Sequence, residues 1–454
     1  MQKTDKIAIL GYGTEGVALY EYLNAHGFKD ITICDQKESL EDAEGKGGKV
    51  PKVKLRLGKN YLKNLSDFDV VFRSPGVKYL DLEIQKAKKV GVEISSATKL
   101  FFEKCPCKII GVTGTKGKGT TATLITKILE NADNGGKKNS IFLGGNIGVP
   151  AIEFLDKLNK NSIVILELSS FQMQDLEMSP HIAVILNTTS DHMDYHKNVA
   201  EYLKAKEAIV KYQKTGDYAI FNKDYPYNKK YAKLTKAKKI FISAKDVKKK
   251  FGDIKIALPG PHNLENVAPA VAVCEILKVP KNRMIKTLET WHGLEHRLEF
   301  VEEISGVKYY NDSFSTNPPS TIAAIKSFPE NNMILIAGGS EKFSDFTELG
   351  KEIVAQKNLK IVILIGQMAD RIEEAILKAE KKYGEKKSGK SFEKSARILL
   401  LIRRDNFDDA VFEAYIRAKT GWVVAMSPAA ASFDMFKNYK ERGKKFKEIV
   451  RSFR

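Results

Sequence analysis

Residues 109–121 (IIGVTGTKGKGTT) constrain the fold most strongly, because an apolar, β-branched run enters a glycine-rich turn with two lysines. The residues after the turn, 120–129, have helix-compatible spacing of apolar side chains. Backbone N–H groups of such a turn, a lysine and a helix N-terminus together attract phosphate oxygens. The stretch predicts a strand, a phosphate-binding loop and a helix, and hence a chain that handles a nucleoside triphosphate.

The loop departs from the common phosphate-loop pattern at two positions. Val112 stands where that pattern has glycine, and Gly119 stands directly after Lys118, where Ser or Thr is usual. Thr120 comes one residue later, so the sequence leaves open which hydroxyl would reach a Mg²⁺ ion. An ordinary glycine-rich turn between a strand and a helix is the alternative interpretation.

The length and the strand pattern predict an α/β protein of three domains. A chain of 454 residues exceeds the usual size of one or two domains. Short apolar strands alternate with helical segments, which is typical of parallel sheets; they are expected at 6–10, 31–34, 70–72, 162–166, 182–186, 218–221, 333–337, 361–365 and 422–425. We place the domains at 1–100, 101–298 and 299–454. The Gly-, Ser- and Lys-rich stretch 381–394 is expected to be a surface loop.

Composition argues against several classes of protein. No apolar run reaches the roughly 18 residues of a membrane-spanning helix, and the N-terminus is a poor secretory signal. The four cysteines, Cys34, Cys105, Cys107 and Cys274, lack the spacing of a zinc site or a disulfide framework. The net charge of +19 comes from scattered lysines without a nucleic-acid motif. We therefore expect a reduced, cytoplasmic protein with a solvated basic surface that binds neither nucleic acid nor membranes.

A second glycine motif lies near the N-terminus. Residues 11–16 (GYGTEG) follow an expected strand and open an expected helix, and Asp35 ends the next strand. This is the arrangement that binds a nucleotide diphosphate on a helix N-terminus, with the acidic residue near a ribose hydroxyl. By itself the motif also suits a nicotinamide dehydrogenase, or a tight turn without any ligand.

Polar residues follow two further strands. Glu167 begins the stretch ELSSFQ, and residues 187–196 (NTTSDHMDYH) follow the next strand. A carboxylate at the end of a parallel strand beside a phosphate loop suits Mg²⁺, and the second cluster suits metal, phosphate or proton chemistry. Lys206, on the expected helical stretch 200–212, is unremarkable from the residues alone.

The chain resembles the Mur ligases, and most closely the members that add glutamate. The resemblance is carried by the ordered segments GTKGKGTT (114–121), GGNIGVP (144–150), ELSSFQ (167–172), DHMDYH (191–196), YLKAK (202–206), PHNLENVAPA (261–270), HGLEHRLE (292–299), NDSFSTNP (311–318), GGSEKFSDF (338–346) and SPAAASFDMFKNYKERG (427–443). It implies Rossmann-like first and third domains, a central ATP-binding domain with a mostly parallel sheet, and a monomeric ATP-dependent ligase. The implied substrates are UDP-N-acetylmuramoyl-L-alanine, glutamate and ATP, for peptidoglycan precursor synthesis.

The resemblance also implies roles for individual residues. The UDP part of the substrate would meet Gly13, Thr14, Asp35, Ser74 and Asn146. ATP would meet Gly114, Thr115, Lys116, Gly117, Lys118, Gly119, Thr120, Asn263, Asn266, Arg297 and Asp312. Two Mg²⁺ ions would be held by Thr120, Glu167, His192 and Lys206, with Lys206 carbamylated to support the second ion. Glutamate would meet Thr316, Lys342, Ser432 and Tyr439, and the catalytic residues would be Lys118, His192, Lys206 and Arg297.

Two departures from the family pattern keep other interpretations open. Gly119 follows the loop lysine, as in the related folylpolyglutamate synthetases, and Phe314 stands where glutamate-adding members typically have lysine. A folylpolyglutamate synthetase-like ligase is therefore one alternative, although its relatives lack the N-terminal glycine-motif domain. An NAD-dependent oxidoreductase would leave Glu167, His192 and the phosphate loop at 114–121 without a task. A non-catalytic UDP-sugar-binding regulator would not need Lys118. The residues do not determine the configuration of the added amino acid.

Overall fold

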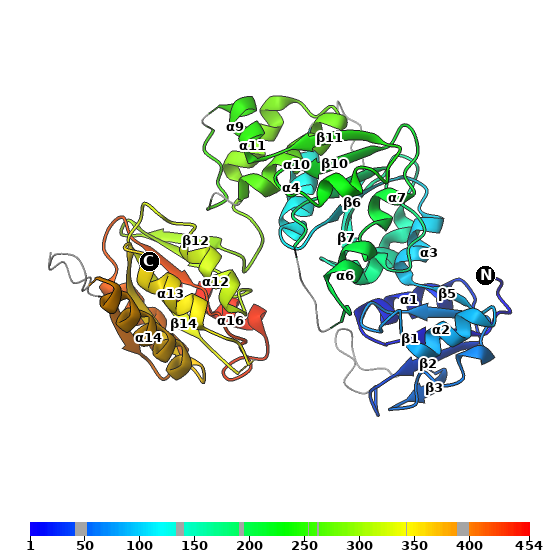
Figure 1. Cartoon of the computed structure of the whole chain (residues 1–454), viewed down its shortest axis with the longest axis horizontal. Helices are drawn as coiled ribbons and strands as arrows, with labels where there is room; N and C mark the ends of the chain where they lie inside the picture. Colours follow the sequence, from blue (N-terminus) through cyan, green and yellow to red (C-terminus); the bar gives the residue numbers. More distant parts are fainter. Residues whose placement is uncertain are drawn as a thin grey trace. The chain divides into compact units, whose positions relative to one another are not determined.

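The computed structural model (Figure 1) describes residues 1–40, 52–132, 140–189, 195–252, 254–260, 263–341, 343–387 and 399–454. The chain divides into two compact units. The first comprises residues 1–254 and 264–287, and the second comprises residues 255–263 and 288–454. The described part of the chain has no helix that is both long and apolar enough to cross a membrane.

The first sheet has five parallel strands in the order β3-β2-β1-β4-β5. The strands are β1 Ile7–Leu10, β2 Ile31–Asp35, β3 Lys54–Leu57, β4 Val70–Arg73 and β5 Glu93–Ser95, and the helices are α1 Thr14–Ala25, α2 Leu82–Lys89, α3 Ala97–Lys104 and a 3-10 helix at Leu65–Asp67. Ile7 and Ile9 belong to the same core as residues of α1 and α3, whereas Ala8 and Leu10 share a core with residues of α2. Both faces of β1 are therefore covered, which explains its uninterrupted apolar sequence.

The second sheet has six parallel strands in the order β11-β10-β9-β6-β8-β7, with β6 near its centre. Its strands are β6 Lys108–Thr113, β7 Ile141–Gly145, β8 Ile163–Glu167, β9 Ile182–Ile185, β10 Tyr218–Asn222 and β11 Lys238–Ile242. The helices of this region are α4 Lys118–Glu130, α5 Ser170–Met173, α6 Val199–Ala205, α7 Ala208–Lys211, α8 Asn228–Tyr231, α9 Ala244–Phe251, α10 Asn263–Ile276, α11 Lys281–Thr290 and a 3-10 helix at Ala151–Lys157.

The first two sheets share one compact unit because their cores are continuous. A single cluster of buried side chains includes Ile7 of β1, Phe101 of α3 and Val164 of β8. Arg73, at the end of β4, forms an ion pair at 3.1 Å with Asp175, and both side chains are almost fully buried. Removing either partner would leave an uncompensated buried charge, so this pair ties the two sheets together.

The third sheet forms the core of the second unit, in the order β12-β13-β17-β14-β15-β16. Its strands are β12 Glu299–Ile304, β13 Val307–Asn311, β14 Met333–Gly338, β15 Leu359–Ile365, β16 Leu400–Arg403 and β17 Val423–Met426, and its helices are α12 Pro318–Ile325, α13 Thr347–Ala355, α14 Ala369–Lys387, α15 Phe407–Arg417 and α16 Tyr439–Arg451. β12 and β13 form an antiparallel hairpin, and the remaining pairings are parallel. The mostly parallel α/β architecture expected from the sequence is confirmed.

The predicted strands are confirmed to within two residues at each end, and the four cysteines are free thiols, as expected. The domain boundaries at 100 and 298 stay predictions. The helix expected over 200–212 is instead broken into α6 and α7, and Lys206 caps the C-terminus of α6. The N–H groups of Lys206 and Ile209 bond the carbonyls three residues earlier, so the chain makes a tight turn there.

The prediction of a surface loop over 381–394 is wrong for its first half. Residues 381–387 continue α14, while 388–394 lie outside the described residues. Ile372 and Ile376 are fully buried on the same helix face, and Lys378 pairs with Glu374 one turn away. Apolar spacing and good helix formers carry this helix into a segment whose charge and glycine suggested a loop.

Candidate active site

The glycine-rich loop lies between β6 and α4, as predicted. Gly114 and Gly117 adopt positive φ values, and a Cβ at Gly117 would lie 2.0 Å from the Asn266 side-chain oxygen. α4 begins at Lys118, whose Nζ bonds the carbonyl oxygens of Gly114 at 3.2 Å and Thr115 at 3.1 Å. The lysine is therefore folded over the loop at a helix N-terminus, where phosphate oxygens are attracted.

Asn187, which follows β9, anchors the loop. Its backbone oxygen accepts from the N–H of Thr115 at 2.7 Å, and its side-chain oxygen accepts from the N–H of Lys116 at 2.7 Å. The Thr115 hydroxyl contacts the Thr189 backbone and the Tyr202 hydroxyl at 3.0–3.1 Å. These hydrogen bonds of the Thr115 hydroxyl and of the Thr115 and Lys116 N–H groups fix the conformation of the loop. The sequence did not reveal this role.

The hydroxyls of Thr120 and Thr121 are the two that follow the loop lysine and could reach a Mg²⁺ ion. The hydroxyl of Thr121 is fully buried and donates to the backbone oxygen of Asn266. Because Thr121 is engaged in packing α10 against α4, Thr120 is the better candidate for the ion. Asn263 lies one turn before Asn266 on α10, so both asparagines predicted to meet ATP share a helix face.

Lys206 reaches the phosphate loop from the end of α6. Its side chain is about 1% exposed, and its Nζ lies 3.2 Å from the Thr113 hydroxyl and 3.3 Å from the Gly114 carbonyl oxygen. The amine also lies over the Tyr202 ring, 4.7 Å from the centroid. Lys206 is thus placed at the loop by the break between α6 and α7.

Glu167 lies beside the loop on the neighbouring strand. Its Cα is paired with Val112 of β6, its side chain is buried, and its Oε1 accepts from the Asn146 side-chain amide at 3.0 Å. The structure therefore brings Glu167 and Asn146 together near the carboxyl end of β6. His192, another of the predicted Mg²⁺ ligands, lies outside the described residues.

A buried Ser–His–Glu arrangement lies nearby. Ser170 and the Nε2 of His196 are 2.9 Å apart, and the Nδ1 of His196 lies 3.3 Å from Glu201. Hydrolases use such triads for nucleophilic attack. Here Ser170 is 1% exposed, and the contacts join α5 to α6.

The N-terminal glycine motif shows three different uses of glycine. Gly11 turns the chain with φ +85°, and a Cβ on Gly16 would lie 2.1 Å from the Gly11 carbonyl oxygen. Gly13 has an ordinary φ of −83°, and its Cβ would meet nothing within 4 Å. The fold therefore requires the first and third glycines, whereas the second leaves open space before Thr14, the first residue of α1, as a bound diphosphate would need.

Ser74 and Asp35 border the same turn. Ser74 donates to the Gly11 carbonyl oxygen at 2.8 Å, at the point where β1 lies between β2 and β4. The Asp35 carboxylate accepts from the N–H groups of Tyr12 at 2.6 Å and Lys37 at 2.9 Å. Asp35 therefore shapes the glycine turn itself, whatever it contributes to a ligand.

In the second unit, Arg297 lies on a tightly constrained segment. The flanking residues His296 and Leu298 both have positive φ values, +64° and +43°. The carboxylate of Asp312 accepts from the Leu298 N–H at 3.0 Å and from the hydroxyls of Ser315 and Ser427 at 2.6 Å each. Burial raises the pKa of Asp312 to about 6, against the opposing effects of these bonds and of Arg297. Asp312 is 2% exposed, so it positions the Arg297 segment from inside.

Three of the predicted glutamate-binding residues lie on two neighbouring segments. Ser313 donates to the backbone oxygen of Tyr439, and the buried Arg442 bonds Ser313 together with the backbone oxygens of Ala430 and Ala431. These bonds join the segment bearing Thr316 to the segment bearing Ser432 and Tyr439. Lys342 lies outside the described residues. Sequence reasoning missed Arg442, although it stands inside the quoted segment 427–443.

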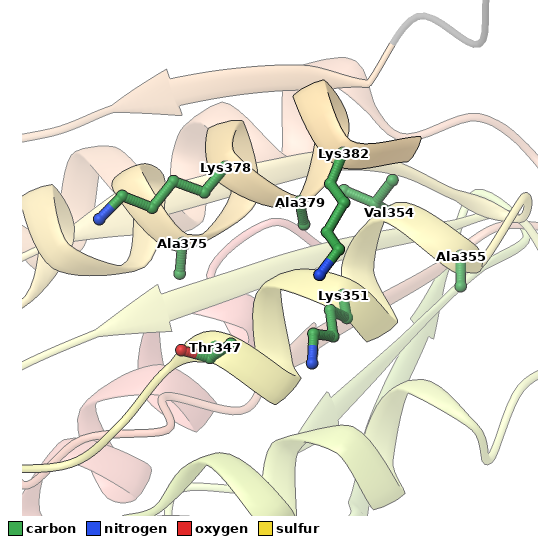
Figure 2. Close-up of a pocket in the computed structure, with 8 residues that line it drawn as sticks. All are labelled: Thr347, Lys351, Val354, Ala355, Ala375, Lys378, Ala379 and Lys382. Atoms are coloured by element: carbon green, nitrogen blue, oxygen red, sulfur yellow. The ribbon is translucent and has the colours of Figure 1, made fainter. Parts of the chain in front are cut away.

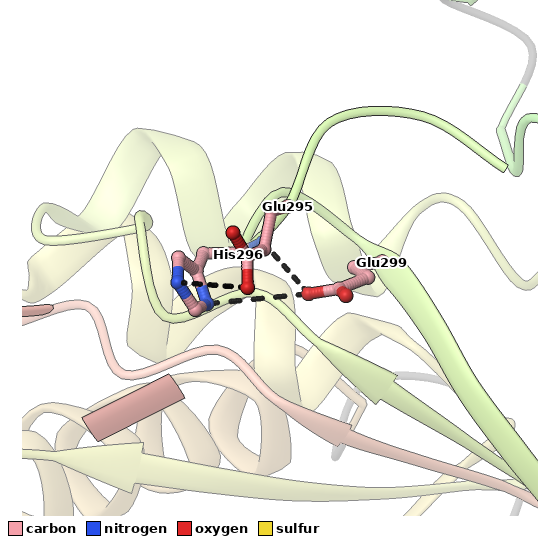
Figure 3. A group of neighbouring side chains, drawn as sticks. All are labelled: Glu295, His296 and Glu299. Carbon is pink, nitrogen blue, oxygen red and sulfur yellow. Dashed lines mark hydrogen bonds and ion pairs between the residues drawn. The ribbon is translucent and has the colours of Figure 1, made fainter. Parts of the chain in front are cut away.

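Two further features of the second unit carry none of the predicted residues. A cavity of about 550 Å³ lies between α13 and α14 and is lined by Thr347, Lys351, Val354, Ala355, Ala375, Lys378, Ala379 and Lys382 (Figure 2). Glu295, His296 and Glu299 bring possible ligand atoms together (Figure 3). However, Lys447 bonds both glutamates, at 2.6 and 2.9 Å, so an ammonium group already balances their charge.

Comparison with known proteins shows which family the chain resembles. The model for the MurD-like N-terminal domain of Mur ligases matches residues 5–96, that for the Mur ligase middle domain matches 112–274, and that for the glutamate ligase domain of Mur ligases matches 296–429. The UDP-N-acetylmuramoylalanine–D-glutamate ligase of Acetivibrio thermocellus is 39% identical over 99% of this chain and 97% of its own. The chain belongs to the Mur ligase family. The enzyme of the same name from Ruminiclostridium cellulolyticum is 36% identical over 100% of this Mur ligase and 97% of its own length.

Solved structures show the fold of this Mur ligase. The UDP-N-acetylmuramate-alanine ligase MurC from Thermotoga maritima has a TM-score of 0.56 at 17% identity, covering 99% of this chain and 100% of that one. The MurF ligase from the same organism, in complex with ADP, has a TM-score of 0.55 at 17% identity, covering 98% and 95%. The similarity at full length does not favour a folylpolyglutamate synthetase-like ligase or an oxidoreductase.

Proposed function

We propose that this Mur ligase adds D-glutamate to UDP-N-acetylmuramoyl-L-alanine, using ATP, in the synthesis of peptidoglycan precursors. The observation that carries the proposal is the match at full length to ligases named for this reaction, at up to 39% identity. The geometry supports it, because Lys118 and Lys206 both approach Gly114 of the phosphate loop. We further propose that the enzyme acts as a monomer in the cytoplasm.

The residues beside the loop fit Mg²⁺. Glu167 is a buried carboxylate on the strand next to β6, and Mg²⁺ prefers such hard oxygen ligands. We propose that Thr120, Glu167, His192 and a carbamylated Lys206 hold two ions. When bound, the ions neutralise charge on the phosphate oxygens. Carbamylation would convert the buried Lys206 amine into a carboxylate at a position that already faces the loop.

The reaction needs activation of a carboxylate, because its oxygen is a poor leaving group. The γ-phosphoryl group of ATP passes to the carboxylate of the alanyl substrate, which gives an acyl phosphate and releases ADP. The amine of glutamate then attacks the carbonyl carbon, and the tetrahedral intermediate expels phosphate. Lys118 and Arg297 would stabilise the charge that builds up on the transferring group.

The other sites supply binding and orientation. The open space at Gly13 suits the diphosphate of the nucleotide substrate on the N-terminus of α1. The segments that Arg442 joins would hold glutamate through Thr316, Ser432 and Tyr439, together with Lys342. Asn263 and Asn266 would flank adenine beside the loop.

Phosphate release from ATP tests the proposal. The enzyme is assayed with UDP-N-acetylmuramoyl-L-alanine and a panel of D- and L-amino acids, and separately with a folate and glutamate. Release that requires both the nucleotide substrate and D-glutamate is expected. Release only with the folate would overturn the proposal in favour of the folylpolyglutamate alternative, and release only with another amino acid would correct the substrate.

A further inference from the structure

The guanidinium group of Arg297 stacks on the ring of Phe314. The Cζ of Arg297 lies over the Phe314 ring, 4.5 Å from its centroid, and the ring itself is 44% exposed. An aromatic face attracts a cation placed over it at such a distance.

The backbone on both sides of the contact is fixed. Arg297 lies between two non-glycine residues with positive φ values, and its N–H bonds the Leu294 carbonyl oxygen at 3.1 Å. The Phe314 N–H bonds the His296 carbonyl oxygen at 2.9 Å, which ties the two segments directly. The conformational freedom of Arg297 therefore lies in its long side chain rather than in its backbone, and the stacking on Phe314 restricts that side chain.

The ring of Phe314 is held in turn by α16. Tyr439, the first residue of α16, meets the Phe314 ring edge to face at 5.1 Å and the His296 ring at 5.9 Å. Gly443, one turn further, leaves room for His296, because a Cβ there would lie 2.2 Å from the His296 Nδ1. The platform beneath Arg297 is thus built from three packed rings rather than from one loose side chain.

We propose that Phe314 is a positioning residue that holds the Arg297 guanidinium ready for a phosphate group of the nucleotide. The inference rests on the proposed function, in which Arg297 meets ATP. Stacking uses the face of the guanidinium, whereas its N–H donors lie in the plane of the group. A lysine at 314 would instead place a second cation beside Arg297.

Four variants test the role. Phe314→Tyr keeps the ring, Phe314→Leu removes it, and Phe314→Lys replaces it with a cation. Phe412→Leu is the control on α15, where Phe412 is 52% exposed. We expect the KM for ATP to rise about two- to fivefold in Phe314→Leu, the range for an exposed cation–π contact. Phe314→Lys should raise it further, whereas Phe314→Tyr and Phe412→Leu should stay near the parent. The kcat should fall in Phe314→Leu and Phe314→Lys, because a poorly held Arg297 also stabilises the transferring group less, whereas the KM for glutamate should change little.

A second readout measures the contact without catalysis. Phenylglyoxal modification of Arg297, followed by peptide mass spectrometry on the full chain without substrates, should be about two- to fivefold faster in Phe314→Leu than in Phe314→Tyr. An inactive parent enzyme would contradict the proposed function, and this measurement would still report on the stacking. Equal ATP KM values for the Leu and Tyr variants, or a change confined to the KM for glutamate, would overturn the proposal. A Phe314→Lys enzyme as good as the parent would overturn it as well.

Discussion

The Nζ of Lys206 lies 3.3 Å from the carbonyl oxygen of Gly114, so the end of α6 touches the first residue of the phosphate loop. Lys118 bonds the same oxygen from the other side of the turn, at 3.2 Å. One backbone carbonyl therefore accepts from two lysines that are 88 positions apart in the chain (206 minus 118). The two side chains have different surroundings, since Lys206 is buried and Lys118 is half-buried, and we predict different consequences when each is removed.

Lys118→Ala should lower turnover by roughly 10²–10³, because one positioned donor at a developing anion has about that effect. The matched control is Lys127→Ala, at the far end of α4, where Lys127 is exposed and paired with Glu130. Initial rates of phosphate release with saturating substrates check the prediction. Near-parental turnover of Lys118→Ala would remove the loop lysine from the mechanism.

Lys206→Ala should lose activity and regain part of it when formate or acetate is added. A small carboxylate can enter the space left by the side chain and replace the proposed carbamate. Lys204→Ala serves as the control, because Lys204 is exposed on the same helix. The absence of rescue by any small carboxylate would leave the carbamate without support.

Gly13→Ala should bind the UDP substrate less well without losing stability. Its Cβ meets no protein atom, so the added methyl group is felt only by a ligand that approaches the α1 N-terminus. A steric cost of about 1–3 kcal/mol corresponds to a KM for the nucleotide substrate roughly 5- to 150-fold higher. Gly16→Ala is the contrasting variant, and it should destabilise the fold through its clash with Gly11. An unchanged nucleotide KM in Gly13→Ala would place the diphosphate elsewhere.

Glu15→Gln should stabilise the region around α1 more at pH 8 than at pH 5. Burial raises the pKa of Glu15 to about 7, while the bond from Gln172 and the charge of Arg73 oppose the rise and Asp175 adds to it. The folded protein therefore keeps the Glu15 proton at pH values above 4.5, where the unfolded chain releases it. Proton binding by Glu15 thus stabilises the folded state at low pH, and this stabilisation is lost as the pH rises through 7. The stabilisation of the folded state by Glu15→Gln should be up to about 3 kcal/mol larger at pH 8 than at pH 5.

Hydrogen exchange of the α1 amides, corrected for the intrinsic rates, measures this difference. Glu21→Gln is the control, because Glu21 is exposed on the same helix. Its effect on α1 should be independent of pH. An effect of Glu15→Gln that is equal at pH 5 and pH 8 would show that the buried carboxyl does not titrate in this range.

Sequence patterns predicted the elements and the site residues that depend on local order. Gly114 to Lys118 form a loop between a buried strand and a helix because glycine permits positive φ values and apolar periodicity defines the flanking elements. The position of Glu167 at a strand end followed from the same rule, since ends of neighbouring parallel strands meet at one edge. The extension of α14 was missed because glycine, serine and lysine in 381–394 also occur in loops.

The sequence by itself determined the order of strands and helices, the two glycine turns and the chemical types of the site residues. Only the tertiary structure decided which of them meet. The α6–α7 break directs Lys206 toward Gly114, Asn187 engages the Thr115 and Lys116 N–H groups, and Phe314 lies under Arg297. These contacts join residues that are distant in sequence, and they depend on packing and hydrogen bonding between separate elements. Local periodicity carries no information about such distant partners.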